Sequence, residues 1–278
     1  MGLKITTLSE NTAGLGNFLA EWGLSILVET GDLTLLLDTG QSISATANAS
    51  ILGVDLSRID RIILSHGHYD HTGGLPHVLR EVNKTVPVVA HPDIWADKYS
   101  GREGQDYRYI GIPYQRQLLE SLGASFDLLT VPVKMGDGIT TSGEVPMITG
   151  FEKVESYLLV KDANGFKQDE LLDDQALIIE TGEGLVVILG CAHRGIINTL
   201  YHARQLTGVE EVYAVLGGCH LMDASRERVR LTIAALKEVG VQRLGVSHCT
   251  GLSAACVMAR EFGDGFFFNN AGTVINLP

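Results

Sequence analysis

The sequence predicts an α/β protein in which two β-sheets pack face to face and helices cover their outer sides. One observation is a pair of similar apolar hairpins, with strands at residues 24–29 and 33–38 in the first and 177–182 and 185–189 in the second. The other is that a helix, a strand, a helix and a strand follow each hairpin. Strands that alternate with helices indicate α/β layering, and two halves that each leave one sheet face bare are expected to stack through those faces.

The spacing of apolar residues places the elements that follow each hairpin. In the first half a helix is predicted at 45–52, a strand at 61–64, a helix at 75–82 and a strand at 86–90. In the second half the same order is predicted at 196–206, 212–216, 226–239 and 243–246. Because no segment has the composition of a linker, we expect a single domain over residues 1–278.

Composition narrows the class of function. With 278 residues, 45% of them hydrophobic, the chain can bury a sizeable core. The formal net charge of −12 disfavours a nucleic-acid partner, because the average surface repels phosphate. No apolar run is long enough for a membrane span or a signal peptide, so we expect no membrane partner and a cytoplasmic location. The expected partner is a small-molecule substrate, and the expected assembly is a monomer or a homodimer.

The four cysteines lie in the last third of the chain, at Cys191, Cys219, Cys249 and Cys256. None of them forms a Cys-x-x-Cys pair, and a disulfide framework is not expected. Three of the four stand next to a histidine or two residues from one. This neighbourhood suggests metal binding.

The segment 65–74, Ser-His-Gly-His-Tyr-Asp-His-Thr-Gly-Gly, follows directly on an apolar strand. In an extended chain His66 and His68 point to the same side, so both imidazoles can reach one ion. Asp70 and His71 come where the chain turns into a helix. We expect them to face a second ion about 3.5–4 Å away, which is the spacing that two-metal hydrolases use.

The pattern His66-x-His68-x-Asp70-His71 resembles the signature of the metallo-β-lactamase superfamily. This resemblance implies a four-layer αβ/βα sandwich, the metallo-β-lactamase fold, in agreement with the two stacked sheets inferred above. It also implies that Asp38, at the end of the first hairpin, is a buried acid that orders the metal loop without binding metal. A turn-forming aspartate is the alternative interpretation of Asp38.

Three later histidines, His193, His220 and His248, each follow an apolar strand. Functional side chains of α/β proteins collect at the carboxyl ends of strands, so we expect these histidines to be metal ligands as well. Three further histidines lie on predicted helices or after an outer strand and are interpreted as structural or surface groups: His77, His91 and His202.

The sequence departs from the superfamily pattern in one respect. Most members place a histidine before the second hairpin and a bridging aspartate at its end, whereas residues 136–175 contain no histidine and the second hairpin ends at Cys191. Either Cys191 or His193 is expected to take the bridging place. The predicted cofactor is one or two divalent transition-metal ions. A thiolate favours zinc, while imidazoles and a carboxylate also accept manganese, iron or nickel.

Residues 97–117 break the alternation of strands and helices and are rich in tyrosine and arginine, which predicts an insertion near the active site. We expect Arg102 and Arg108 to bind phosphate and Tyr107 to stack on a planar ring such as a pterin. The alternative is a solvated loop with aromatic anchors, because nearby acidic residues offset much of its positive charge.

A wider run of motifs, from residues 10–12 to 271–273, resembles a branch of metal-dependent hydrolases within this superfamily. That branch includes a synthase that joins a dihydropterin diphosphate to a ribofuranosyl-aminobenzene 5′-phosphate. The resemblance implies a metal-dependent hydrolase that acts on a small phosphorylated substrate through activated water, with Asp70 as a catalytic group. The alternatives are a transferase of the pterin synthase type that releases diphosphate, and a non-hydrolytic metal-binding or redox protein.

Overall fold

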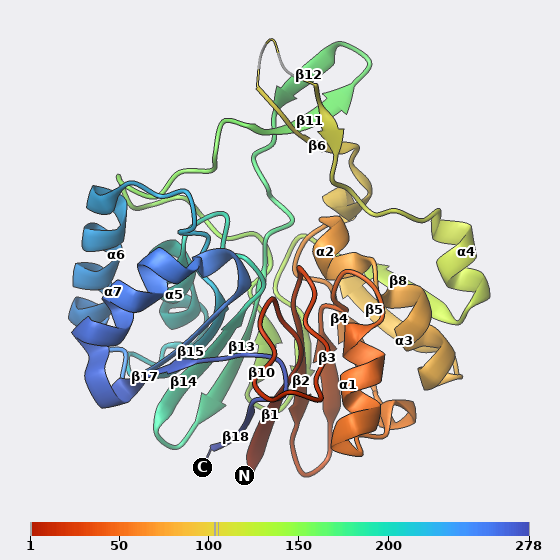
Figure 1. Cartoon of the computed structure of the whole chain (residues 1–278), viewed down its shortest axis with the longest axis horizontal. Helices are drawn as coiled ribbons and strands as arrows, with labels where there is room; N and C mark the ends of the chain where they lie inside the picture. The colour runs from red at the N-terminus through yellow and green to blue at the C-terminus, as the bar shows by residue number, and fades with distance from the viewer. Residues whose placement is uncertain (1, 103, 105, 278) are drawn as a thin grey trace.

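The computed structural model describes residues 2–102, 104 and 106–277. The described chain forms two large sheets that stack face to face, with helices on both outer sides (Figure 1). The predicted four-layer αβ/βα sandwich is therefore confirmed. Within the described residues, no helix combines the length and apolar character that a bilayer span requires.

The first sheet contains the N-terminal hairpin and, at one edge, the last strand of the chain. Its order is β18 (Val274–Leu277), β1 (Leu3–Ser9), β2 (Ser25–Glu29), β3 (Thr34–Leu37), β4 (Arg61–Ile63), β5 (Val86–Ala90) and β8 (Ala124–Leu128). The last four strands in this order run parallel, so their carboxyl ends meet at one edge. The outer face is covered by α1 (Ser44–Leu52), α3 (Leu75–Val82) and α4 (Arg116–Ser121).

The second sheet contains the second hairpin and the parallel strands that follow it. Its order is β17 (Phe266–Phe268), β16 (Arg243–Ser247), β15 (Val212–Gly218), β14 (Gly184–Leu189), β13 (Ala176–Thr181), β10 (Ile139–Thr141) and β9 (Lys134–Gly136). Three helices cover its outer face: α5 (Ile196–Thr207), α6 (Arg226–Val239) and α7 (Leu252–Phe262). The strands β14, β15 and β16 also run parallel.

Alternation along the strands divides the apolar residues between layers. In β2, Leu27 packs against the helices, while Ile26 and Val28 lie between the two sheets. In β13, Ile178 faces the helices and Leu177 faces the other sheet. Because both faces of each sheet are buried, these strands are apolar throughout, and this made them recognisable in the sequence.

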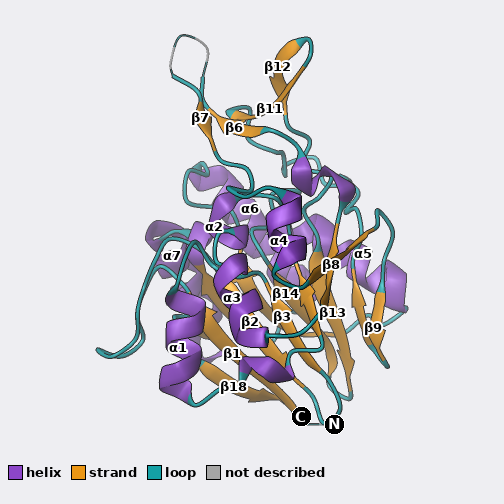
Figure 2. Cartoon of the chain, turned by 90° about the vertical axis from the view of Figure 1, so that its right-hand side faces the viewer, coloured by secondary structure: helices purple, strands orange, loops and turns teal. Residues whose placement is uncertain are grey.

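A smaller third sheet lies beyond the carboxyl ends of the strands (Figures 1 and 2). Its order is β12 (Gly165–Gln168), β11 (Leu158–Asp162), β6 (Lys98–Ser100) and β7 (Arg108–Tyr109). The predicted insertion 97–117 supplies β6 and β7, and β6 pairs with β11. Residues 136–175 contain β10, β11 and β12, whereas the sequence alone indicates one strand there, at 156–160, which overlaps β11. The exposed strand β12 leaves no apolar run to recognise.

Short helical turns complete the description: α2 (Tyr69–Thr72), η1 (Leu56–Arg58), η2 (Pro92–Trp95), η3 (His248–Thr250) and η4 (Gly263–Gly265). Of these, α2 lies beyond the carboxyl end of β4, and η3 directly follows the carboxyl end of β16. Both turns carry histidines that the sequence analysis selected.

A buried ion triad fixes the third sheet to the sandwich. The Lys98 side chain is 1% exposed, and its Nζ lies 2.7 Å from Asp169 Oδ2 and 2.9 Å from Asp173 Oδ1. The other oxygen of Asp173 accepts a hydrogen bond of 2.8 Å from the backbone N–H of Gly67. One lysine of β6 is thus connected through a carboxylate to the loop between β4 and α2.

Replacing Lys98 with methionine is expected to destabilise the protein strongly, by about 3–5 kcal/mol, because two buried carboxylates lose their cation. Urea unfolding followed by circular dichroism measures the free energy of unfolding. The control is Lys134→Met, which removes an exposed pair with Asp137 and should have little effect. Equal stability of the Lys98 and Lys134 variants would contradict a structural role for the triad.

Candidate metal centre

The loop after β4 carries the first ligands and is held close to its neighbours. A Cβ atom on Gly67 would overlap the carbonyl of Ile94, and one on Gly74 would overlap the carbonyl of Thr39. Glycine is therefore required at both positions for the backbone to pass. This tight path brings the side chains of the loop to the edge where β3, β4, β14, β15 and β16 end.

The first donor group consists of His66, His68 and His193. His66 Nε2 lies 2.9 Å from His68 Nδ1 and 3.3 Å from His193 Nε2. A tetrahedral zinc ion with Zn–N bonds of about 2.0–2.1 Å separates its nitrogen ligands by roughly 3.3 Å. The three nitrogens therefore have the spacing that one such ion requires.

The second donor group consists of Asp70, His71 and His248. His248 Nε2 lies 3.2 Å from Asp70 Oδ2 and 3.3 Å from His71 Nε2. His248 arrives from the end of β16, so this group joins the metal loop to the second sheet. Both donor groups fit a divalent ion, and they contain the ligand types that transition metals prefer.

Cys191 lies between the two groups. Its Sγ is 3.1 Å from His71 Nε2, and the same sulfur falls within 4.8 Å of donor atoms of both His66 and His71. Cys191 thus lies where a bridging ligand is expected, while His193 is grouped both with His66 and His68 and with Cys191 and His220. Burial raises the pKa of the Cys191 thiol well above its usual value, so a cation is needed to hold it as a thiolate.

Hydrogen bonds from behind orient two of the imidazoles. Ser65 Oγ donates to Asp38 Oδ2 at 2.7 Å and can therefore accept from His66 Nδ1 at 2.8 Å. Asp38 Oδ2 also accepts from His71 Nδ1 at 2.6 Å. Both imidazoles then direct an Nε2 lone pair into the centre. Asp38 is fully buried and is placed where the predicted ordering role requires it.

His248 is oriented by Asn11 and Glu10, which belong to the wider run of motifs but were not predicted as site residues. Asn11 Oδ1 accepts from the backbone N–H of Gly23 at 3.1 Å and lies 2.9 Å from His248 Nδ1. An oxygen that accepts from one N–H can accept a second, so Asn11 can hold a proton on His248 Nδ1 when a metal ion takes the Nε2 lone pair. Glu10 Oε1 accepts from the backbone N–H of His248 at 2.6 Å.

Burial and neighbouring charged groups shift the pKa values of the histidines in the centre. Burial and neighbouring imidazoles hold the pKa of His66, His68 and His193 well below the usual value, so these three stay neutral. Burial also opposes the charge of His71, but Asp38 and Asp70 outweigh it and raise the pKa of His71 to about 9. A metal ion must displace that proton, so metal binding is coupled to proton release.

His220 lies at the edge of the centre. Its ring centroid is 4.0 Å from that of His193, and its Nε2 is 3.2 Å from Glu155 Oε2. Burial disfavours its charged form, yet hydrogen bonds to Cys249 and Glu155 raise the pKa of His220 to about 10. In that ion pair Nε2 offers no lone pair to a metal. The ligand role expected of His220 therefore competes with the Glu155 contact.

A cleft of about 200 Å³ opens above the donor groups. Besides the ligands, it is lined by Trp22, Tyr69, Arg108 and Tyr157. Arg108 donates a hydrogen bond of 2.8 Å to Tyr69 Oη. Two other residues were predicted to bind substrate. Tyr107 packs on Phe166 with ring centroids 4.1 Å apart, and Arg102 lies over the ring of Tyr157. Neither is among the described residues that line the cleft.

The structural histidines are placed as expected outside the donor groups. His91 pairs with Glu144 at 3.0 Å, and His202 donates to the carbonyl of Ser142 at 3.0 Å. Three buried ring nitrogens at the centre have no hydrogen-bond partner among the described residues: His68 Nε2, His193 Nδ1 and His220 Nδ1. Such a concentration of unsatisfied polar atoms is typical of a site built to bind a ligand or an ion.

Comparison with known proteins agrees with this geometry. The family model of the metallo-beta-lactamase superfamily matches residues 23–201. The chain is 36% identical to the 7,8-dihydropterin-6-methyl-4-(beta-D-ribofuranosyl)-aminobenzene-5′-phosphate synthase of Methanocaldococcus jannaschii, over 98% of this chain and 96% of the synthase. An uncharacterized protein of the same organism is 32% identical over 98% of this chain and all of its own length.

A solved structure is similar over nearly the whole chain. It is that of a protein named as a metal-dependent hydrolase of the beta-lactamase superfamily. The two chains share 28% identity with a TM-score of 0.86, and the match covers 99% of each.

Replacing His68 with alanine is expected to remove at least one metal ion per chain, because it deletes one of three imidazoles in the first donor group. Elemental analysis of the purified protein measures the metal content, with up to two ions per chain expected before substitution. The control is His77→Ala on α3, which should retain the full content. Identical metal content in the two variants would contradict the assigned ligands.

Replacing Asn11 with alanine is expected to weaken metal binding about 10- to 100-fold, because His248 loses the acceptor that fixes its tautomer. Chelator competition measures the affinity without any substrate. Asn11→Asp keeps an acceptor oxygen and should retain most of the affinity, and Asn164→Ala in an exposed turn should retain all of it. If the alanine and aspartate variants bind metal equally well, the orienting role of Asn11 is excluded.

Proposed function

The chain belongs to the metallo-β-lactamase superfamily, and we propose that it is a metal-dependent hydrolase of a small phosphorylated substrate. The observation that carries this proposal is the pair of donor groups that share Cys191 directly beneath a cleft with an arginine in its wall. Superfamily members typically bind divalent metal ions, and zinc suits a site with a cysteine between two imidazole groups.

The donor sets fit divalent ions, with His66, His68 and His193 around one and Asp70, His71 and His248 around the other. When bound, such ions lower the pKa of a water molecule toward neutrality and offset negative charge that develops on the substrate. Contacts with His71 and His248 overcome the effect of burial and hold the pKa of the Asp70 carboxyl well below its usual range. Asp70 therefore stays ionised, and its carboxylate can orient the attacking water.

The cleft walls supply substrate binding. The guanidinium of Arg108 lies 5.1 Å from the centre of the Tyr69 ring and donates to its hydroxyl, which fixes the cation at the cleft opening. A fixed guanidinium suits a phosphate group, to which it can donate two parallel hydrogen bonds. The rings of Trp22 and Tyr157 provide flat apolar surface on which a planar ring of the substrate can stack.

A second candidate function is a synthase that joins two substrates and releases diphosphate. It is favoured by the 36% identity, over almost the full length of both chains, to a synthase of a dihydropterin-containing product. In this reaction the amine or carbon nucleophile of the second substrate replaces water, and the same positive charge stabilises the leaving diphosphate. Arg108 serves both reactions, because each substrate carries phosphate.

Incubation of the metal-loaded protein with a dihydropterin diphosphate and a ribofuranosyl-aminobenzene 5′-phosphate is expected to distinguish the two. Diphosphate or phosphate release without a coupled product supports the hydrolase, because water is then the acceptor. A coupled product of the combined mass, detected by mass spectrometry, supports the synthase. Absence of both products under conditions that retain bound metal contradicts the synthase and excludes this diphosphate as the substrate of the hydrolase.

Replacing Arg108 with glutamine is expected to raise KM for a phosphorylated substrate about 10- to 100-fold, since a hydrogen bond to a charged group contributes about 1.5–3 kcal/mol. Steady-state kinetics measures the effect, and the metal content should not change. Arg116→Gln on α4 removes an exposed arginine paired with Glu120 and serves as the control. An unchanged KM in the Arg108 variant would exclude the proposed phosphate contact.

A further inference from the structure

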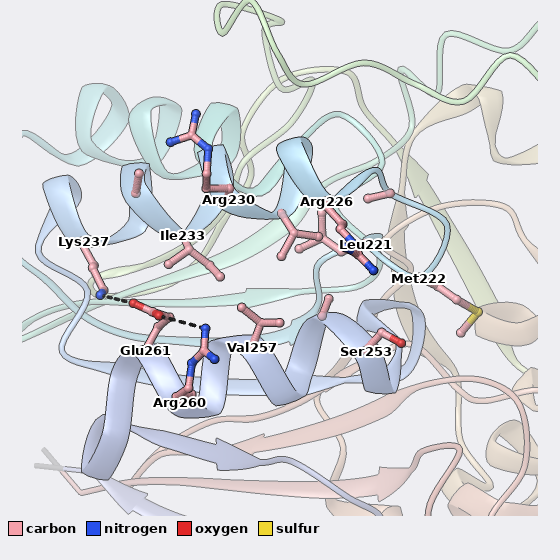
Figure 3. A pocket seen from close by; sticks show the side chains of 14 residues that line it. Leu221, Met222, Arg226, Arg230, Ile233, Lys237, Ser253, Val257, Arg260 and Glu261 are labelled. Atoms are coloured by element: carbon pink, nitrogen blue, oxygen red, sulfur yellow. Dashed lines mark hydrogen bonds and ion pairs between the residues drawn. The ribbon is translucent and has the colours of Figure 1, made fainter.

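A groove of about 680 Å³ lies between α6 and α7, on the helical side of the second sheet. Its lining side chains come from one stripe of each helix and from residues 221–224 before α6, with Ile233 and Val257 facing each other across it (Figure 3). None of the residues in the donor groups described above lines it. The groove is thus separate from the metal centre.

The floor of the groove is apolar and open. Ala234 and Ala254 have small side chains where the two helices face each other, and this leaves space that larger residues would fill. Val257 is 38% exposed and Met222 is 45% exposed. A volume of this size falls in the range of about 300–1,000 Å³ that small-molecule sites occupy.

The rim of the groove is positively charged in a chain whose net charge is −12. Four cations line it against one acid, Glu261: Arg226, Arg230, Lys237 and Arg260. Lys237 and Arg260 both pair with Glu261, at 2.8 and 3.5 Å, so they share one negative charge (Figure 3). Arg230 pairs at 2.7 Å with Glu227, which does not line the groove. Arg226 has no ion-pair partner among the described residues.

The positions of the cations fit a linear ligand. Arg226 and Lys237 lie at opposite ends of the groove (Figure 3). They are about three turns apart on α6, which is roughly 16 Å. The apolar floor between them accommodates an extended hydrocarbon chain, and a cation at either end can pair with an acidic head group. Exposed ion pairs are weak, so such a head group can replace Glu261 as the partner of Arg260.

We infer that the groove between α6 and α7 binds a linear amphipathic anion, a hydrocarbon chain with a carboxylate head. Its charge complements the basic rim, while most of the protein surface repels it. Its chain buries methylene groups against the apolar floor, and each buried methylene strengthens binding about fourfold. This site does not depend on the proposed function of the metal centre.

Isothermal titration calorimetry of the full chain with dodecanoate, below its micelle concentration, tests the inference. We expect one dodecanoate per chain. Octanoate should bind at least about tenfold more weakly because it buries fewer methylenes. Dodecyltrimethylammonium, with the same chain and the opposite charge, should bind at least about tenfold more weakly than dodecanoate. Equal binding of the two head groups, or no binding of dodecanoate at millimolar concentration, overturns the proposal.

Variants locate the binding to this groove. Ala234 is exposed and lines the groove, so Ala234→Phe fills it and should weaken dodecanoate binding more than about tenfold. Val257→Asp, which places negative charge on the floor, should have the same effect and replaces the first variant if that one fails to fold. The double variant Arg226→Gln and Arg260→Gln should weaken binding about three- to tenfold.

The matched controls are Gln205→Phe on α5 and Arg80→Gln on α3, both at exposed positions outside the groove. They should change the affinity less than twofold. Dodecanoate binding that survives both Ala234→Phe and Val257→Asp overturns the proposal. If analytical ultracentrifugation shows a dimer that Val257→Asp dissociates, the groove binds a second copy of the chain and the proposal is overturned. If the groove binds an acidic amphipathic peptide and not dodecanoate, its ligand is a partner protein and the proposal is also overturned.

Discussion

The candidate centre depends on buried imidazole nitrogens that the fold holds close together. His66 Nε2 stands 2.9 Å from His68 Nδ1 and 3.3 Å from His193 Nε2, and burial keeps all three rings neutral. Ser65 takes the proton on the far side of His66, so its lone pair must point inward. A neutral His68 can donate its Nδ1 proton to the His66 lone pair, but a metal ion between the rings requires a lone pair from each of the three. The surrounding fold must therefore hold the rings in place before the ion arrives.

The sandwich provides that support through the ends of parallel strands. β3 and β4 bring Asp38 and the metal loop from one sheet, while β14 and β16 bring Cys191 and His248 from the other. Both sheets are buried on both faces, so their strand ends cannot shift independently without disturbing a packed core. Orientation by Asp38 and Asn11 then fixes the rings themselves. The strand ends thus fix where each imidazole lies, while the hydrogen bonds fix which of its nitrogens carries the proton.

Sequence reasoning recovered the parts of this arrangement that have a local signature. The apolar hairpins, the helices at 45–52 and 226–239, and the histidines after strands are all patterns within a few residues of one another. Asn11 gives no such signal, because its partner His248 is remote in the sequence and a lone asparagine in a loop is ordinary. The pairing of β6 with β11 was missed for the same reason, since polar strands far apart in the chain reveal their contact only after folding.

The third sheet contributes to the cleft without supplying a residue of either donor group. It contributes Arg108 to the cleft, yet its main connection to the sandwich is the buried Lys98, which reaches the metal loop through Asp173 and the Gly67 N–H. Among the described residues, the side chains of β7 and β12 belong to neither donor group. Substitutions there can change which substrate is bound without altering the ligands. Cys191 has no such freedom, because its sulfur lies within ligand distance of both groups and its thiolate form requires the cation that they bind.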